Sequence, residues 1–241
     1  MKLRILLPLV GFALVGVLMY SYSASAEGAS ISARRETRAA FTSPLASAIP
    51  RLTLVRFVNA LPGSAPLEVG RDSAMLFANV VFGAVSPYTP LSAGAHHFTL
   101  RHPASTQNDA VSKATLLEGE RYTVLALTDT AGHSQLRVIL DELAPDSGMA
   151  RVRVINAAAG VDRVVVRLRG GDDPFLTAVN GTSVAQVRDV SPTSAGFSLR
   201  TAANVPLATI QSVALLQGVS YTFVITSRPR SAATTISIVD R

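Results

Sequence analysis

Short runs rich in Val, Ile, Leu, Thr and Phe follow one another from residue 51 to the C-terminus, separated by Gly, Pro, Asn and Asp. None of these runs shows the 3.6-residue period of an amphipathic helix. Short apolar runs bounded by turn-forming residues are typical of β-strands. We therefore predict strands at 52–59, 66–70, 74–82, 95–101, 113–117, 121–128 and 135–141, and again at 150–156, 162–169, 175–179, 182–188, 195–200, 207–215, 219–226 and 234–239.

This pattern occurs twice. The segment VRFVNA at 55–60 returns as VRVINA at 152–157, which is 97 positions later. LEGERYT at 117–123 returns as LQGVSYT at 216–222, which is 99 positions later. A repeat of this length is the size of a domain, and seven or eight short strands suit a two-sheet sandwich. The sequence therefore predicts two tandem antiparallel β-sandwich domains, immunoglobulin-like or Greek-key, over 51–146 and 147–241.

Three local patterns add detail to the predicted strands. Asn180-Gly181 separates two apolar runs, and both residues tolerate the positive φ of a type I′ turn, so we predict a tight hairpin there. The runs beginning at Tyr122 and Tyr221 are apolar at nearly every position, as expected for a strand covered on both faces. Leu-x-Gly-x-x-Tyr before each of these strands suggests a corner in which the tyrosine hydroxyl bonds to nearby backbone.

The N-terminus has the layout of an export signal. Lys2 and Arg4 precede an apolar stretch over 5–19, and Ala24-Ser25-Ala26 fits a cleavage site. We expect a signal peptide over 1–26 with cleavage after Ala26, a flexible linker over 27–50, and a periplasmic or secreted protein. A segment retained as a membrane anchor is the alternative.

The formal net charge of +6 is unevenly distributed. Residues 51–146 carry seven basic and nine acidic side chains, whereas residues 147–241 carry ten basic and five acidic ones. This difference predicts a basic face on the second copy only. Because export separates the protein from nucleic acid, we do not expect a nucleic-acid partner.

The order of several segments carries a family resemblance. VRFVNA, FGAVSPYTPLSAGAHHFTLR, LLEGERYTVLALT and ARVRVINAA follow one another from residue 55 to residue 158. This order resembles a bacterial family known as domain of unknown function 4397, and the likeness extends in two copies over about residues 51–241. The second copy departs from the family pattern because no tyrosine follows Pro192, as Tyr88 follows Pro87. The resemblance implies an exported β-sandwich without assigned activity, and it transfers no catalytic residue.

Catalytic chemistry has little support in the residues. The chain has no cysteine and no G-x-S-x-G motif. The acidic pairs Glu118/Glu120 and Asp172/Asp173 lie beside glycines, where acidic residues commonly form turns. We therefore expect a non-enzymatic protein.

Three histidines lie close together in the sequence, but their spacing does not suit a metal. His96 and His97 are adjacent on a predicted strand and point to opposite faces, and His102 lies about 20 Å from His96 by strand rise. We expect neither a metal nor a cofactor, and histidines that are exposed or locally hydrogen-bonded.

Arginines give the sharpest local signal. Arg163, Arg167 and Arg169 alternate with apolar residues along one predicted strand, and Arg151 and Arg153 share a face of the preceding strand. If these strands are neighbours with both arginine faces outward, five guanidiniums line one sheet surface and can bind carboxylate or phosphate. We take these five residues as a candidate anion-binding patch. A solvated outer sheet face is the alternative interpretation.

These observations favour an exported binding or structural module of the cell envelope, whose second domain contacts an anionic envelope glycan, a lipid headgroup or an acidic protein surface. Two alternatives stay open. One is a hydrolase with its site in the cleft between the domains, which a convergent group of His, Ser and Asp would support. The other is a structural spacer within a larger surface assembly.

Overall fold

A computed structural model describes residues 51–241, except for 130, 143, 172, 180–184 and 229–231. The expected signal peptide, its cleavage site and the linker lie outside the described residues, as does the hairpin at Asn180-Gly181. The described residues belong to one compact unit. Among the described residues, no helix has both the length and the apolar character needed to span a membrane.

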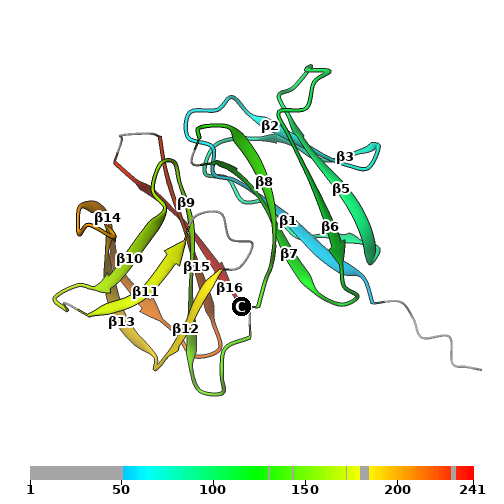
Figure 1. The fold of residues 1–241 in the computed structure, drawn as a ribbon. Coiled ribbons are helices and arrows are strands. Elements are labelled where there is room, and N and C mark those ends of the chain that lie inside the picture. Colours follow the sequence, from blue (N-terminus) through cyan, green and yellow to red (C-terminus); the bar gives the residue numbers. More distant parts are fainter. Residues whose placement is uncertain (1–50, 130, 143, 172, 180–184, 229–231) are drawn as a thin grey trace, which may run out of the picture. The chain divides into compact units, whose positions relative to one another are not determined.

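All regular structure in the described part of the chain is β-strand (Figure 1). The first half contains β1 (Thr53–Asn59), β2 (Leu67–Arg71), β3 (Ala74–Val80), β4 (Thr89–Leu91), β5 (Gly94–Arg101), β6 (Ala110–Leu116), β7 (Arg121–Thr128) and β8 (Ser134–Leu140). The second half contains β9 (Ala150–Ala158), β10 (Arg163–Leu168), β11 (Pro174–Val179), β12 (Gln186–Val190), β13 (Thr193–Thr201), β14 (Pro206–Leu215), β15 (Ser220–Ser227) and β16 (Thr234–Asp240).

The strands form four sheets, two in each half. The orders are β4-β1-β7-β8 and β3-β2-β5-β6 in the first half, and β12-β9-β15-β16 and β11-β10-β13-β14 in the second. Adding eight to each strand number of the first half gives the order of the second. The all-β fold of two β-sandwiches is therefore as predicted. The pairs β1·β7 and β9·β15 are parallel, which the antiparallel prediction did not anticipate.

Alternating side chains build a separate core in each sandwich. In β5 the buried residues His96, Phe98 and Leu100 alternate with more exposed ones, as a period of two requires. The first core packs around Phe57 and Phe98, and the second around Phe197 and Phe223. Full burial of one such side chain contributes about 1.5–3 kcal/mol, so each sandwich holds a substantial core of its own.

The central strands are buried on both faces, as predicted from their continuous apolar sequence. Every residue of β15 is buried, and β7 is buried from Tyr122 to Leu127. One face of each strand lies in its own core. The other face contributes to a third apolar cluster that joins the two sandwiches and includes Leu125 and Val224. Sheets β4-β1-β7-β8 and β12-β9-β15-β16 therefore face each other.

The predicted tyrosine corners are confirmed. The N–H of Leu117 donates to the hydroxyl of Tyr122 at 3.0 Å, and the N–H of Leu216 donates to that of Tyr221 at 2.9 Å. The Tyr221 hydroxyl also donates to the carbonyl oxygen of Ala214 at 2.8 Å. Each bond spans seven residues or fewer, so the sequence pattern alone was enough to predict it.

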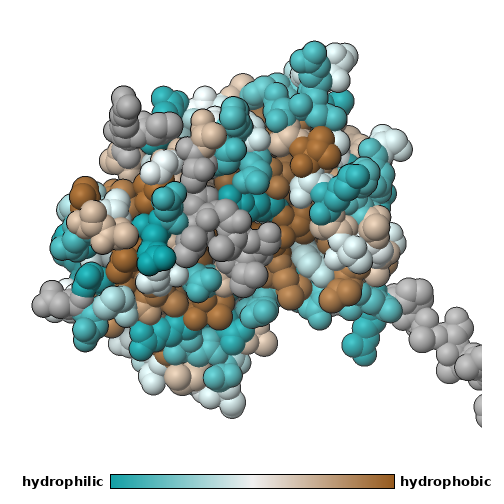
Figure 2. Space-filling view, viewed as in Figure 1, coloured by the Kyte–Doolittle hydropathy of each residue, from teal (hydrophilic) through white to brown (hydrophobic). Residues whose placement is uncertain are grey.

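Several predicted strand boundaries differ from the structure. β4 was not predicted, because it has only three residues and contains Pro90, which is tolerated here at the edge of a sheet. β6 begins at Ala110 rather than at 113, in a stretch where exposed residues, among them Val111, alternate with partly buried ones. On the space-filling surface, hydrophilic and hydrophobic residues are interspersed over both sandwiches in the view shown (Figure 2).

Candidate functional site

The five arginines of the predicted patch do not line one surface. Arg151 and Arg153 lie on β9, and Arg163 and Arg167 lie on β10, with Arg169 just after it. β9 pairs with β12 and β15, whereas β10 pairs with β11 and β13 in the opposite sheet of the sandwich. The expectation that the two strands are neighbours is therefore wrong. β9 and β10 follow each other in the chain but belong to different sheets. The spacing of residues in the sequence does not reveal this change of sheet.

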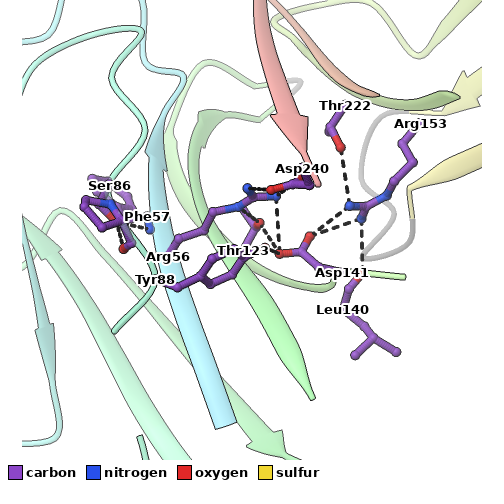
Figure 3. A network of polar contacts seen from close by, with 11 residues as sticks. Arg56, Phe57, Ser86, Tyr88, Thr123, Leu140, Asp141, Arg153, Thr222 and Asp240 are labelled. Carbon is purple, nitrogen blue, oxygen red and sulfur yellow. Dashed lines mark hydrogen bonds and ion pairs between the residues drawn. The ribbon is translucent and has the colours of Figure 1, made fainter. Parts of the chain in front are cut away.

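Arg153 lies in the contact between the sandwiches and is fully buried. Its Nη1 and Nη2 each donate to Oδ1 of Asp141 at 3.1 Å, and Nη2 also donates to the carbonyl oxygen of Leu140 at 3.2 Å (Figure 3). Both partners belong to the first half of the chain. This arginine therefore holds the sandwiches together and is not available to an external ligand.

Arg56 is the counterpart of Arg153 in the first sandwich. Its Nη1 and Nη2 donate to Oδ1 and Oδ2 of Asp240 at 2.7 and 3.1 Å, and Nη2 lies 3.5 Å from Oδ2 of Asp141 (Figure 3). Burial alone lowers the pKa of Arg56, but the hydrogen bonds to Asp240 and the charge of Asp141 outweigh it, so that the pKa is raised. Arg56 is thus a permanent cation between two carboxylates.

Tyr88 and Thr123 also donate hydrogen bonds to Asp141. The Tyr88 hydroxyl donates to Oδ2 of Asp141 at 2.8 Å, and the Thr123 hydroxyl donates to the same oxygen at 2.7 Å. The guanidinium of Arg56 stacks over the Tyr88 ring, 4.7 Å from its centroid. Burial raises the pKa of Tyr88, so its hydroxyl stays protonated and donates. A buried carboxylate needs such partners, since each unsatisfied oxygen is costly.

Sequence reasoning missed this network although its residues lie in the repeated motifs. VRFVNA supplies Arg56, VRVINA supplies Arg153, and the segments ending β8 and β16 supply Asp141 and Asp240. The repetition was the available signal. Which arginine meets which carboxylate depends on how the two sandwiches pack together, with separations that range from 12 positions for Arg153 and Asp141 to 184 for Arg56 and Asp240. The spacing does not encode these contacts.

Arg151 also has a carboxylate partner within the protein. Its Nε donates to Oδ1 of Asp189 at 2.7 Å, and its Nη2 donates to Oδ2 at 2.9 Å. This hydrogen bonding lowers the pKa of Asp189 and raises that of Arg151. The backbone N–H of Asp146 donates to the same carboxylate at 2.7 Å. Arg151 thus ties β12 and the connector between the sandwiches to β9.

Arg167 and Arg169 do lie together, and the structure adds a third arginine to them. They line a cavity of about 470 Å³ on the outer face of the sheet that contains β10 and β13. On β13, Ser198 lies opposite Arg167, and Arg200 lies two residues further along, opposite Val165. The described residues of the lining include no carboxylate: Arg167, Leu168, Arg169, Gly170, Gly171, Ser198, Arg200 and Asn204.

The three arginines of this cationic cavity form no ion pair among the described residues. Arg169 and Arg200 each donate from Nη1 to a neutral acceptor, Gln211 Oε1 at 3.2 Å and the carbonyl oxygen of Asn204 at 3.0 Å. Nε of Arg167 is buried and has no hydrogen-bond partner in the described part of the chain. Among the described residues, no carboxylate neutralises their positive charge. Arg163 is exposed on the same strand and lies outside the cavity.

Gly196 makes room for Arg169. A Cβ atom at Gly196 would lie 2.8 Å from Cδ of Arg169 and 3.3 Å from the carbonyl oxygen of Ile210. The N–H of Arg169 donates to the carbonyl oxygen of Gly196 at 2.9 Å. The side chain therefore passes over the glycine to reach Gln211 on β14, and the glycine sets its position.

The equivalent place in the first sandwich carries both acidic and basic side chains. Gly70, which lies opposite Thr99, corresponds to Arg167, which lies opposite Ser198. Glu68, which lies opposite Arg101, corresponds to Val165, which lies opposite Arg200. Glu68 neutralises Arg101, with 2.9 Å between Oε2 and Nε. The second sandwich has lost that acid and gained an arginine where the first has glycine.

Asp72 occupies the place of Arg169. Its N–H donates to the carbonyl oxygen of His97, the same backbone bond that Arg169 makes to Gly196. The Asp72 carboxylate accepts hydrogen bonds from the N–H of His97 and from His96, which lower its pKa. Part of the charge difference between the two halves therefore lies at this equivalent site.

The histidines form no metal cluster in the described residues. His96 is buried, with Nδ1 3.1 Å from Oδ2 of Asp72 and Nε2 3.0 Å from the carbonyl oxygen of Ser92. β5 ends before His102, which is exposed, as is His97. His96 is locally hydrogen-bonded, as expected.

A larger cavity of about 640 Å³ opens at the junction of the two sandwiches. Residues from both contribute to it, including Asp141 and Asp240, whose carboxylates already bind Arg153 and Arg56. The described residues that line it include neither His nor Ser. The arrangement that would support a hydrolase in this cleft is not found among them.

One family model matches the chain. Residues 53–167 match domain of unknown function 4397. The match covers 115 of 241 residues, namely the first sandwich and the first two strands of the second. It includes Arg56, Tyr88, Asp141 and Arg153 of the network between the sandwiches. No curated protein matches the chain.

Solved structures give more distant likenesses. A family 26 carbohydrate-binding module from Eubacterium rectale, crystallised with maltoheptaose, is 10% identical over 78% of this chain and 96% of that chain, with a TM-score of 0.25. A candidate adhesin from Bacteroides ovatus is 10% identical over 80% and 93%, with a TM-score of 0.23. A candidate cell adhesion protein from Bacteroides fragilis is 14% identical over 80% and 97%, with a TM-score of 0.22. Similarity at this level does not support an argument about function.

Proposed function

We propose that the protein is an exported, non-enzymatic binding module of the cell envelope, built from two copies of one domain, which binds an anionic group in the cationic cavity of its second sandwich. Support for two copies comes from the identical strand orders and from Arg56 and Arg153, which each lie opposite a threonine of a parallel neighbour. The domains span 51–146 and 147–241 in this proposal.

The observation that carries the binding function is the difference in charge at equivalent sites. Glu68, Gly70 and Asp72 in the first sandwich correspond to Val165, Arg167 and Arg169 in the second. Guanidinium groups bind carboxylate, phosphate or sulfate through paired N–H donors. Three of them around one cavity suit a single compact anionic group, carried by a glycan, a lipid headgroup or an acidic protein surface.

The test compares two triple variants of the same net charge. One replaces Arg167, Arg169 and Arg200 with Ser. The control replaces Arg51, Arg163 and Arg241, which are exposed and lie outside the cavity. Binding of inorganic phosphate, sulfate and glucuronate, with glucose as the neutral probe, is measured by calorimetry.

We expect the cavity variant to lose anion binding by at least about tenfold and the control to change it less than twofold, because a charged hydrogen bond contributes about 1.5–3 kcal/mol. Equal losses in both variants would show that net charge alone attracts the anions, and the proposal would then be wrong. The same variants tested for retention on isolated envelope material show which source carries the anion.

A further inference from the structure

The contact between the sandwiches is reciprocal. Arg56 of the first sandwich binds Asp240 of the second, and Arg153 of the second binds Asp141 of the first. The two arginines hold equivalent places, opposite Thr123 and Thr222 of the parallel neighbouring strands. Each half thus supplies the cation of one pair and the anion of the other. Reciprocity of this kind characterises an isologous interface, in which the same patch is used on both sides.

The apolar part of the contact repeats in the same way. The cluster that joins the sandwiches contains Val58 and Leu125, which lie opposite each other on β1 and β7, and their equivalents Ile155 and Val224 on β9 and β15. Ile139 and Ile238 likewise correspond, each lying opposite one of the two threonines. Both the charged and the apolar residues are therefore arranged in matching pairs.

Each sandwich is otherwise self-contained. All strand pairing in the described residues runs within one half, and each half encloses its own apolar cluster. Only this surface needs a partner, because an isolated half would expose a buried arginine together with large apolar side chains. The first half carries both Arg56 and Asp141, so two first halves can also satisfy each other's charges.

We infer that this surface is a self-complementary association surface, which holds the halves together without their covalent connection and also pairs with the same surface on a second copy of this chain. In such a pair, the arginine of each copy binds the aspartate of the other, and no charge stays buried alone. The connector over 141–149 keeps the local concentration of the partner half high and so favours pairing within one chain.

The experiment starts from the full chain with a protease site inserted at Ser147-Gly148, an exposed turn between β8 and β9. After cleavage, unlabelled and isotope-labelled samples are mixed and examined by native mass spectrometry and by size-exclusion chromatography with light scattering. We expect the halves to elute together and to form pairs of one labelled with one unlabelled half, including pairs of two first halves. Folded halves that elute apart, or a complete lack of pairs between like halves, would overturn the inference.

Charge reversal keeps the test decisive if cleavage disturbs folding. Arg56→Asp or Asp240→Arg alone should weaken the association of the halves by about thirtyfold or more, since removing one partner of a buried pair costs about 2–5 kcal/mol. The double reversal should restore it, whereas Arg163→Asp should leave it unchanged. Circular dichroism confirms that each half stays folded. Single reversals without effect on association would also overturn the inference.

Discussion

Arg56 and Asp240 lie 184 positions apart, yet their side chains form a two-point ion pair with N–O distances of 2.7 and 3.1 Å. The arginine side chain is 4% exposed and the aspartate 10%. The pair joins the first strand of one sandwich to the last strand of the other. Two charges at such depth are stable only together, so the pair makes the position of one sandwich depend on the other.

Removal of one partner should therefore be costly. We expect Arg56→Met to lower the free energy of unfolding by about 3–5 kcal/mol, because it leaves Asp240 without its cation. The matched control is Arg101→Met, which breaks a more exposed pair with Glu68 at 2.9 Å and should cost about 0.2–1 kcal/mol. Urea denaturation measures both values. Equal losses would contradict the role assigned to the buried pair.

Tyr88→Phe tests the hydrogen bond from Tyr88 to Asp141. The variant keeps the ring under Arg56 and removes only the hydroxyl that donates to the carboxylate. A hydrogen bond to a charged group contributes about 1.5–3 kcal/mol, and we expect a loss of that size in thermal or chemical unfolding. Phe82→Leu, in the turn that precedes Tyr88 in the sequence, serves as the control. A Tyr88→Phe variant as stable as the parent would show that Thr123 and the arginines suffice.

The two tyrosine corners provide an internal comparison. The Tyr221 hydroxyl makes two backbone hydrogen bonds, whereas that of Tyr122 makes one. Because a hydrogen bond contributes about 1 kcal/mol net, Tyr221→Phe should destabilise the protein by about 1 kcal/mol more than Tyr122→Phe. Parallel denaturation curves of the two variants measure the difference. The reverse order would mean that the corner in the second sandwich is not held by its hydroxyl.

Gly196→Ala should affect ligand binding more than stability. The added methyl group would lie 2.8 Å from Cδ of Arg169, so the flexible arginine is displaced from its path to Gln211. We expect phosphate affinity to fall several-fold with little loss of stability. Gly70→Ala is the control, because its methyl group would be similarly crowded, 2.6 Å from Oγ1 of Thr99, but lies in the first sandwich outside the cavity. Unchanged affinity in Gly196→Ala would remove Arg169 from the proposed binding site.

Acid should weaken the link between the connector and β12. The side-chain hydrogen bonds from Arg151 lower the pKa of Asp189 below the usual value of about 3.9. A carboxyl whose pKa is lower in the folded than in the unfolded state stabilises the fold above the unfolded pKa, and this contribution is lost as the pH falls through the folded pKa. Asp189→Asn should therefore lower the melting temperature at pH 7 and make its decline below about pH 4 shallower. Melting curves from pH 7 to 2.5 test this, and an unchanged slope would contradict it.

Much of the fold was predictable because it depends on local patterns. Alternation along β5 and the continuous apolar run of β7 identified strands and their exposure, since neighbouring side chains on a strand point to opposite faces. The candidate site was predictable in part. Arg167 and Arg169 were identified from their alternation, whereas Arg200 was not, because it joins them only through the pairing of β10 with β13.

The sequence by itself determined the all-β class, the repeated halves, the tyrosine corners and the excess of positive charge in the second half. These features depend on residue type, on a period of two, or on contacts within a few positions. Only the tertiary structure decided that β9 and β10 lie in opposite sheets, that Arg153 is buried against Asp141, and that Arg167, Arg169 and Arg200 gather around one cavity. Those outcomes depend on which strands pair and which faces of the sheets meet. The free energy that selects them comes from burying apolar surface and pairing charge between segments that the local sequence pattern does not bring together.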